Sequence, residues 1–199
     1  MRKIICLSVI SFFCSILSGF SQFFPVDTAK LNTAYKELLK DRNSDEKQRL
    51  FLDAFPSTFD DFNMTYQFCE GKGYDLSMYF KSADHILNGL ATLNLLPDSV
   101  YYDKLIQLSF GGRFYVDAPN YLRHVLETII KKNPASFFQR LSKFNEGQLI
   151  SFWYFYFNCR FEKDYISDFE KYKEFKSAFP NVVNAMEIAY PASCGKVWY

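Results

Sequence analysis

The two histidines are the residues from which metal chemistry could be built. His124 and Glu127 are three positions apart, so on a helix they share one face and could give a metal ion two ligands. A catalytic zinc site needs three protein ligands, and a di-iron bundle needs two such pairs with two further carboxylates. His85 directly follows Asp84, and adjacent residues on a helix point in different directions. The sequence therefore predicts no metal site.

The sequence has no pattern typical of a catalytic nucleophile or a nucleotide cofactor. A GxSxG motif, which exposes a serine in a tight turn, is absent. Cys69 could act as a thiol nucleophile with either histidine, but its flanking residues show no sign of activation, and buried structural cysteine is commoner. Gly71-Lys72-Gly73 lacks the spacing and the trailing residues of a phosphate-binding loop. We therefore predict no catalytic residue and no cofactor.

An envelope-polymer hydrolase is the enzyme class that these absences leave open. A glycosidase needs only two carboxylates about 5 to 10 Å apart. The chain has 22 acidic residues, so some pair meets that distance in a compact fold. The sequence does not single out such a pair, and this alternative therefore has no named residues.

Arg113-Phe114-Tyr115 is the segment best suited to contact a partner. It follows Gly111-Gly112, in the least helical part of the chain. We predict that a helix stops here and an extended crossing follows; a β-hairpin around the two glycines is the alternative. Binding residues are concentrated in irregular loops on rigid scaffolds, and here such a loop carries a cation. We therefore predict that Arg113, Phe114 and Tyr115 contact a partner. The alternative is that the aliphatic part of the Arg113 side chain only covers apolar surface.

The N-terminus has the pattern of a secretory signal peptide. Arg2 and Lys3 precede an apolar stretch that is interrupted by serines and ends in Gly19-Phe20-Ser21. We expect residues 1–21 to be removed, so that the mature chain begins at Gln22 and works in the periplasm or outside the cell. An uncleaved membrane anchor is the alternative, and the protein would then contact the membrane only through this segment. Lipid attachment is disfavoured because neither cysteine of the segment follows a small residue.

The composition limits which kinds of partner and how many domains the mature protein can have. Without Arg2 and Lys3 the chain has 21 basic and 22 acidic side chains, a net charge of −1. This balance argues against nucleic acid as a partner, because phosphate backbones require a concentrated basic surface. Residues 22–199 suit one domain, which is large enough to bury a substantial core.

Three cysteines remain in the mature chain, Cys69, Cys159 and Cys194, without a CxxC spacing. In an oxidising compartment Cys159 and Cys194 could pair, which would leave Cys69 unpaired. The alternative is that all three are small buried apolar side chains.

Aromatic residues dominate the predicted core: 23 Phe, 14 Tyr and 2 Trp make 20% of the chain. Most recur at the i, i+3, i+4, i+7 spacing of a buried helical stripe. Leu50 and Ile166 are among the residues expected on such stripes, and Met64 is a further candidate. Pro56 and Pro180 each end one helix shortly before the next begins. We therefore predict an all-α, compact multi-helix domain of about eight to ten short helices, with helix-Pro-helix corners and little or no β-structure.

Polar residues with capping chemistry mark the expected helix starts. They are Asp27 or Thr28, Ser44, Ser57-Thr58, Ser82, Pro97-Asp98, Asp117, Asn133, Asn145 and Asn181. The helix that begins at Asn145 contains six successive rings, Phe152 to Phe157, and should be the central one. A buried strand over 149–157 is the alternative, because aromatic residues also favour strands. Residues 190–199 are expected to form a C-terminal tail.

These observations favour binding over catalysis. We expect an exported non-enzymatic helical protein that binds a protein or glycan partner, or another ligand, in the bacterial cell envelope. The alternative is the envelope-polymer hydrolase with unidentified acidic residues. A clustered pair of carboxylates with raised pKa in an open cleft would favour the enzyme, and a convex surface with one apolar patch would favour the binder.

Overall fold

The computed structural model of this protein describes residues 26–67, 78–113, 117–158 and 162–193. This part of the chain is all-α and compact, and none of its residues is in a strand, as the sequence predicts. The predicted signal segment 1–21 and the cysteines Cys69, Cys159 and Cys194 lie outside the described residues. Pairing of Cys159 with Cys194 therefore stays a prediction.

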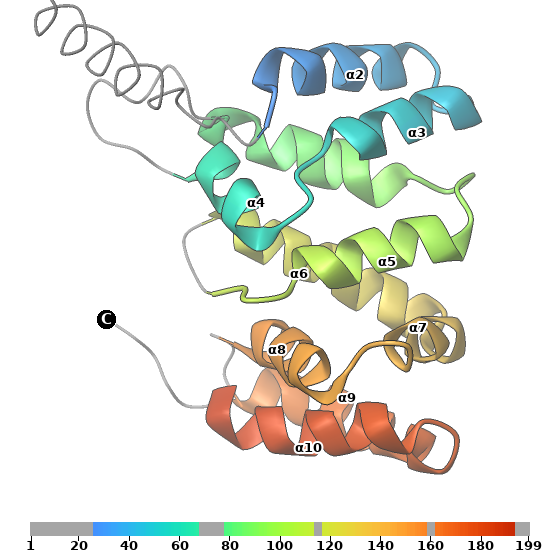
Figure 1. The fold of residues 1–199 in the computed structure, drawn as a ribbon, viewed down its shortest axis with the longest axis vertical. Coiled ribbons are helices and arrows are strands. Elements are labelled where there is room, and N and C mark those ends of the chain that lie inside the picture. The colour runs from blue at the N-terminus through green and yellow to red at the C-terminus, as the bar shows by residue number, and fades with distance from the viewer. Residues whose placement is uncertain (1–25, 68–77, 114–116, 159–161, 194–199) are drawn as a thin grey trace, which may run out of the picture.

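Nine α-helices lie within the described residues. They are α2 (Thr28–Lys40), α3 (Asp45–Ala54), α4 (Phe59–Tyr66), α5 (Asp98–Leu108), α6 (Asp117–Lys132), α7 (Pro134–Leu141), α8 (Glu146–Phe157), α9 (Glu162–Lys173) and α10 (Pro180–Ser193). Short 3₁₀ and π turns are η2 (Tyr79–Lys81), η3 (Asp84–Gly89), η4 (Leu90–Thr92) and η5 (Glu174–Ser177). The helices follow one another along the long axis, from α2 and α3 at one end to α9 and α10 at the other (Figure 1). Each helix therefore packs mainly on elements close to it in sequence.

The helix starts follow the predicted capping chemistry in most places. At five of them a side-chain oxygen accepts a hydrogen bond from the first turn, which satisfies an otherwise unpaired backbone N–H. These N-caps are Asp27, Ser44, Thr58, Asn133 and Asn145. The predicted cap at Asn181 is wrong, because α10 already begins at Pro180, whose fixed φ suits the first helical turn.

The central position of α8 confirms the prediction for this helix, and the strand alternative for 149–157 is wrong. Five of its six consecutive rings are buried, and Tyr154 alone is partly exposed. Trp153 Nε1 donates to the Val182 carbonyl at 3.0 Å, and the Phe157 and Tyr190 rings meet edge to face at 5.0 Å. Helices α8 and α10 therefore run in the same direction, side by side.

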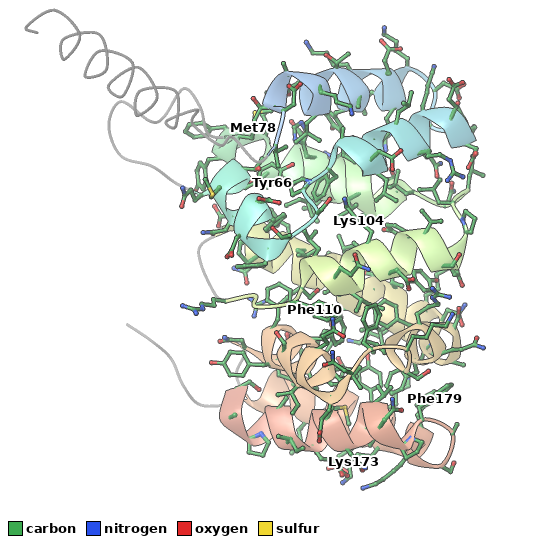
Figure 2. All side chains as sticks on the ribbon, viewed as in Figure 1. Tyr66, Met78, Lys104, Phe110, Lys173 and Phe179 are labelled. Carbon is green, nitrogen blue, oxygen red and sulfur yellow. The ribbon has the colours of Figure 1, made fainter. Side chains whose placement is uncertain are left out.

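A second group of rings fills the N-terminal half. Tyr35, Phe51, Phe55, Phe59, Phe62 and Tyr66 are all buried, on α2, α3, α4 and the corner between α3 and α4. Phe59 also meets Phe155 of α8, with ring centroids 5.6 Å apart. At the helix-Pro-helix corner, Lys104 of α5 donates to the Phe55 carbonyl at 2.9 Å (Figure 2). This bond satisfies the carbonyl group that precedes Pro56.

Some of the residues expected on buried stripes point outward. Leu50 and Met64 are about half exposed, and so is Ile166 of α9. Each is one helical step, or about 100°, away from residues that are buried, such as Phe51 and Thr65. Apolar type alone therefore places these residues on the wrong face.

Two stretches differ in local structure from the prediction. The segment after Ser82 was expected to be a regular helix, but it forms the π turn η3 between two 3₁₀ turns, and the Ser82 hydroxyl donates backward to the Tyr79 carbonyl. Helix α10 continues past Pro191 to Ser193, where a tail was expected. A proline in the last turn removes only one helical hydrogen bond, so the helix can continue.

No helix within the described ranges combines the length and the apolar character that a membrane crossing requires.

Candidate functional site

The predicted partner contact begins at Arg113, which the structure places on the surface. Helix α5 ends at Leu108, and residues 109–113, here called the Arg113 loop, follow it without helical structure beyond a turn. The helix stop is therefore confirmed. Phe114 and Tyr115 lie outside the described residues, so the extended crossing and their part in a contact stay predictions.

Helix α8 holds the Arg113 loop through several contacts. The Gly111 N–H donates to Ser151 Oγ at 2.7 Å, and Gly111 has a φ of +72°, a conformation that favours glycine. Gly112 is buried against the Phe155 ring, where a Cβ atom would come within 2.4 Å of Phe155 Cδ2. Phe110 lies between α5 and α8 (Figure 2) and meets the Phe144 ring at 5.3 Å. The base of the loop is thus fixed.

The chemistry that this loop offers is binding. The Arg113 side chain is exposed and carries a permanent charge with five donors, which suits carboxylate or phosphate groups. The nearby hydroxyls are engaged in the structure: Ser109 Oγ donates to the Leu105 carbonyl, and Ser151 Oγ accepts from Gly111. The loop therefore presents a cation from a rigid base and no activated nucleophile.

His85 is fully buried and therefore has no access to an external metal or substrate. Its Nδ1 lies 3.0 Å from the Tyr66 hydroxyl, and burial lowers its pKa to about 4, so the ring is neutral at pH 7. Asp84 is exposed and accepts a hydrogen bond from Asn88 Nδ2, so the adjacent Asp84 and His85 diverge as predicted.

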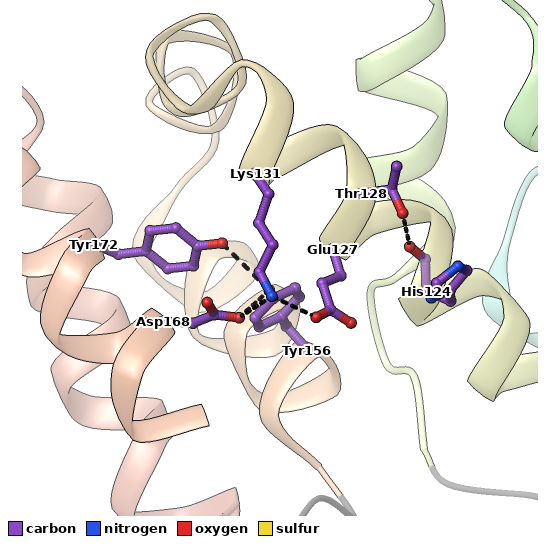
Figure 3. Close-up of polar contacts among 7 residues, drawn as sticks. All are labelled: His124, Glu127, Thr128, Lys131, Tyr156, Asp168 and Tyr172. Carbon is purple, nitrogen blue, oxygen red and sulfur yellow. Dashed lines mark hydrogen bonds and ion pairs between the residues drawn. The ribbon is translucent and has the colours of Figure 1, made fainter. Parts of the chain in front are cut away.

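The pair His124 and Glu127 does not form a metal site. His124 is exposed, while the Glu127 carboxylate turns to Lys131 Nζ at 2.6 Å (Figure 3). Within the described part of the chain, no group of three His, Cys, Asp or Glu side chains could hold a metal ion. Glu127 therefore forms an i, i+4 ion pair with Lys131, one turn further along α6.

Lys131 joins two carboxylates in a cluster that the sequence did not predict, here called the Lys131 cluster (Figure 3). Its ammonium also lies 3.3 Å from Asp168 of α9, which is only 6% exposed. The Tyr156 hydroxyl donates to Asp168 at 3.4 Å and lies 3.4 Å from the Tyr172 hydroxyl. Burial raises the pKa of Tyr156 well above its usual value, so it stays a phenol. The hydrogen bond with Glu127 raises the pKa of Lys131, which stays charged.

The Lys131 cluster tests the hydrolase alternative, because it contains two neighbouring carboxylates. A glycosidase places its carboxyl pair on either side of a sugar. Here the Lys131 ammonium occupies the space between Glu127 and Asp168, and Asp168 is buried beside Tyr156. The arrangement is that of an ion triad that ties α6 to α9, and it gives no support to hydrolysis.

An acidic hollow of about 210 Å³ lies where α2 begins, α3 ends and α4 begins. Asp27, Asp53 and Asp61 line it. Asp27 caps α2, and Asp61 lies in the first turn of α4, where a negative charge complements the helix dipole. Burial lowers the pKa of the nearby Lys104, and Asp53 and Asp61 partly offset this effect. Asp27 and Asp61 therefore have structural roles at the starts of their helices.

The residues of the Lys131 cluster come together only in the folded chain, and the sequence alone did not indicate the cluster. Glu127 and Lys131 show a visible i, i+4 spacing, but Asp168 is far from both in the sequence. A usable signal was present in α9: Asp168 stands between Tyr165 and Tyr172 on one helix face, and both tyrosines are buried. An acidic residue inside a buried aromatic stripe indicates a partner on another element.

No family model, no curated protein and no solved structure matches this chain. Its function is therefore argued from its own residues.

Replacing Gly112 with alanine should loosen the Arg113 loop. The new methyl group would overlap the Phe155 ring and would lie 2.8 Å from the Ser109 carbonyl. We expect the free energy of unfolding to fall by about 1 to 3 kcal/mol, measured by urea denaturation with circular dichroism. Gly147→Ala is the matched control, because its Cβ would meet nothing closer than 3.5 Å, and it should change stability by less than about 1 kcal/mol. Equal effects of the two changes would contradict the packing described.

Replacing Lys131 with methionine should leave Glu127 and Asp168 facing each other without a cation. Because the lysine side chain is 45% exposed and screened by water, we expect a loss of only about 1 kcal/mol in unfolding free energy at pH 7. Lys132→Met, at an exposed neighbouring position, is the control. A loss no larger than that of Lys132→Met would refute the ion triad.

Proposed function

We propose that this chain is an exported, non-enzymatic helical protein that binds a protein or glycan partner in the bacterial cell envelope, through the surface around Arg113. The observation that carries the proposal is the way in which α8 fixes the Arg113 loop. Gly111 is bonded to Ser151, Gly112 is packed on Phe155, and an exposed guanidinium follows. A backbone that is already fixed before Arg113 lowers the entropic cost of binding an anionic group there.

A binding role is favoured over catalysis by what the reactive side chains contact. His85 is buried against Tyr66, and the Glu127 and Asp168 carboxylates share Lys131. A general base or acid must reach a substrate atom within hydrogen-bonding distance, and these groups are turned to internal partners. The exposed cation of the loop is instead available to an external group.

Export is the part of the proposal that rests on the N-terminal sequence. Two basic residues, an apolar stretch and small residues at Gly19 and Ser21 form the three regions of a signal peptide. The described core is built from Val26 onward, which lies after the proposed cleavage site. Cleavage before Gln22 would therefore leave every described helix intact.

Mass spectrometry of the protein isolated from expressing bacterial cells tests export. We expect the periplasmic or secreted form to begin at Gln22, because signal peptidase cuts after small residues such as Ser21. A Gly19→Lys, Ser21→Lys variant should keep the N-terminus intact and accumulate at the membrane. Recovery of the wild-type chain with residues 1–21 still attached would refute the soluble exported form.

Charge reversal at Arg113 tests the contact surface. Mature wild-type protein, Arg113→Glu and the control Lys36→Glu, at an exposed position on α2, are each used to capture partners from envelope extract. We expect wild type and Lys36→Glu to capture the same partner, and Arg113→Glu to capture at least about tenfold less. Circular dichroism checks that all three are equally folded. Undiminished capture by Arg113→Glu would remove this surface from the proposal.

A further inference from the structure

The backbone of segment η3 combines the hydrogen-bonding patterns of a π-helix and an α-helix. Its residues Asp84–Gly89 form a π turn, and the Leu90 N–H that follows is directed at both the His85 and the Ile86 carbonyls. The first of these bonds spans five residues, as in a π-helix, and the second spans four, as in an α-helix. Single π turns of this kind occur frequently at functional positions. A small shift of the segment can therefore exchange one register for the other.

The side chain of His85 lies at the centre of this turn, and its hydrogen bonding is incomplete. The residue is fully buried, with Nδ1 3.0 Å from the Tyr66 hydroxyl. Its Nε2 is buried and has no hydrogen-bond partner among the described residues. The ring is enclosed by Tyr35 of α2 and Phe51 of α3, with centroids at 4.7 and 6.3 Å. Three helices therefore depend on the position of one imidazole ring.

Gly89, at the end of the turn, is pressed against the same helices. A Cβ atom on Gly89 would lie 2.8 Å from Phe51 Cζ and 3.3 Å from Tyr35 Cδ2. The close approach of the backbone leaves no room for η3 to shift while α2 and α3 stay in place. Movement of η3 and separation of α2 and α3 from it are therefore coupled.

A charge on His85 has little to compensate it at this position. The charged groups that act on the ring are Lys81, which lowers its pKa, and Asp84, which raises it, after the larger lowering effect of burial. Arg42, from the loop after α2, donates to the Asn88 carbonyl on the same segment. No described charged group of α3, α4 or α6 is among those that act on the ring.

The tyrosines on α2 and α4 do not supply the missing negative charge. Burial raises the pKa of Tyr66 well above its usual value, and burial also raises the pKa of Tyr35, so both stay phenols. A protonated imidazole has two N–H donors. Nδ1–H can donate to the Tyr66 oxygen, but Nε2–H would have no acceptor among the described atoms. The charged ring is therefore much less stable inside than in water.

We propose that His85 is an acid-operated latch: protonation expels its ring from between Tyr35, Phe51 and Tyr66, shifts the η3 turn, and releases α2 and α3 from the rest of the stack. The neutral ring keeps the N-terminal layer closed. The C-terminal rings around α8 contact each other and α10, so that part of the stack stays packed when the latch opens. The latch does not depend on Arg113.

The pH range of the latch follows from the two states of the ring. His85 has a pKa of about 4 when buried, and an exposed histidine has one of about 6.5. Between these values the open form binds more protons than the closed form, so the population of the open form rises as the pH falls. The opening equilibrium constant should rise by up to about tenfold per pH unit, and about 300-fold in all. Above pH 6.5 it should be independent of pH.

Hydrogen exchange of the whole mature chain at pH 7, 6, 5 and 4, corrected for the intrinsic pH dependence of exchange, tests the latch. Amides of α2, α3 and η3 should lose protection together below pH 6.5, while those of α8 and α10 keep theirs. His85→Phe should remove this pH dependence, and His124→Phe, at an exposed position, should preserve it. Unchanged protection of α2 and α3 between pH 7 and 4 in the wild-type chain overturns the proposal, and so does an unchanged response in His85→Phe.

A second measurement needs no variant, because a substituted core ring can itself prevent folding. Selective ¹³C labelling of histidine allows the charge of the His85 ring to be followed by NMR in the wild-type chain. Its resonances should move to those of a charged imidazole over the same pH range in which α2 and α3 lose protection. A His85 ring that becomes charged while α2 and α3 remain protected overturns the proposal.

Discussion

The Phe155 ring of α8 is one place where the N-terminal and C-terminal parts of the stack are packed together. It meets Phe59 of α4 edge to face at 5.6 Å, and the Arg123 guanidinium of α6 lies 5.9 Å from its centre. Gly112 packs on the same ring. Edge-to-face pairs and cation–π contacts add about 0.5 to 1.5 kcal/mol each to the larger effect of burial. One side chain of α8 therefore fixes a helix of the N-terminal half, a buried cation and the loop that presents Arg113.

A core made of rings limits which polar groups it can enclose. The buried side chains of Gln48 and Asp168 each have polar partners. Gln48 uses its whole amide, donating to the Arg42 carbonyl and to Asn94 Oδ1 and accepting from the Asn94 and Leu95 N–H groups. Asp168 is neutralised by Lys131, whose head reaches water. His85 differs because one ring nitrogen has no partner among the described atoms, and protonation there is costly.

Sequence spacing predicted the helices well because local rules govern them. Caps such as Asp27 and Asn145 act within one turn, and the apolar stripes of α2 and α8 are read at fixed intervals. The errors arise where a distant contact decides. Leu50 is apolar, yet no helix covers its side, and the π turn of η3 forms where the chain passes beneath Phe51. The Lys131 cluster could not be foreseen in full, because Asp168 comes from α9 and the lysine from α6.

The two irregular segments that carry the proposals are positioned by the same physical device. At Gly89 and at Gly112 the backbone approaches an aromatic ring so closely that even a methyl group would collide with it. A ring offers a broad, flat surface, and a glycine without Cβ lets the chain lie against it. The backbone on either side is thereby fixed without regular helical hydrogen bonds. Near Gly89 this holds the turn that carries a buried imidazole, and at Gly112 it holds the backbone that precedes the exposed Arg113. An aromatic-rich helical core can therefore position chemically active side chains in its loops while its helices serve only to pack.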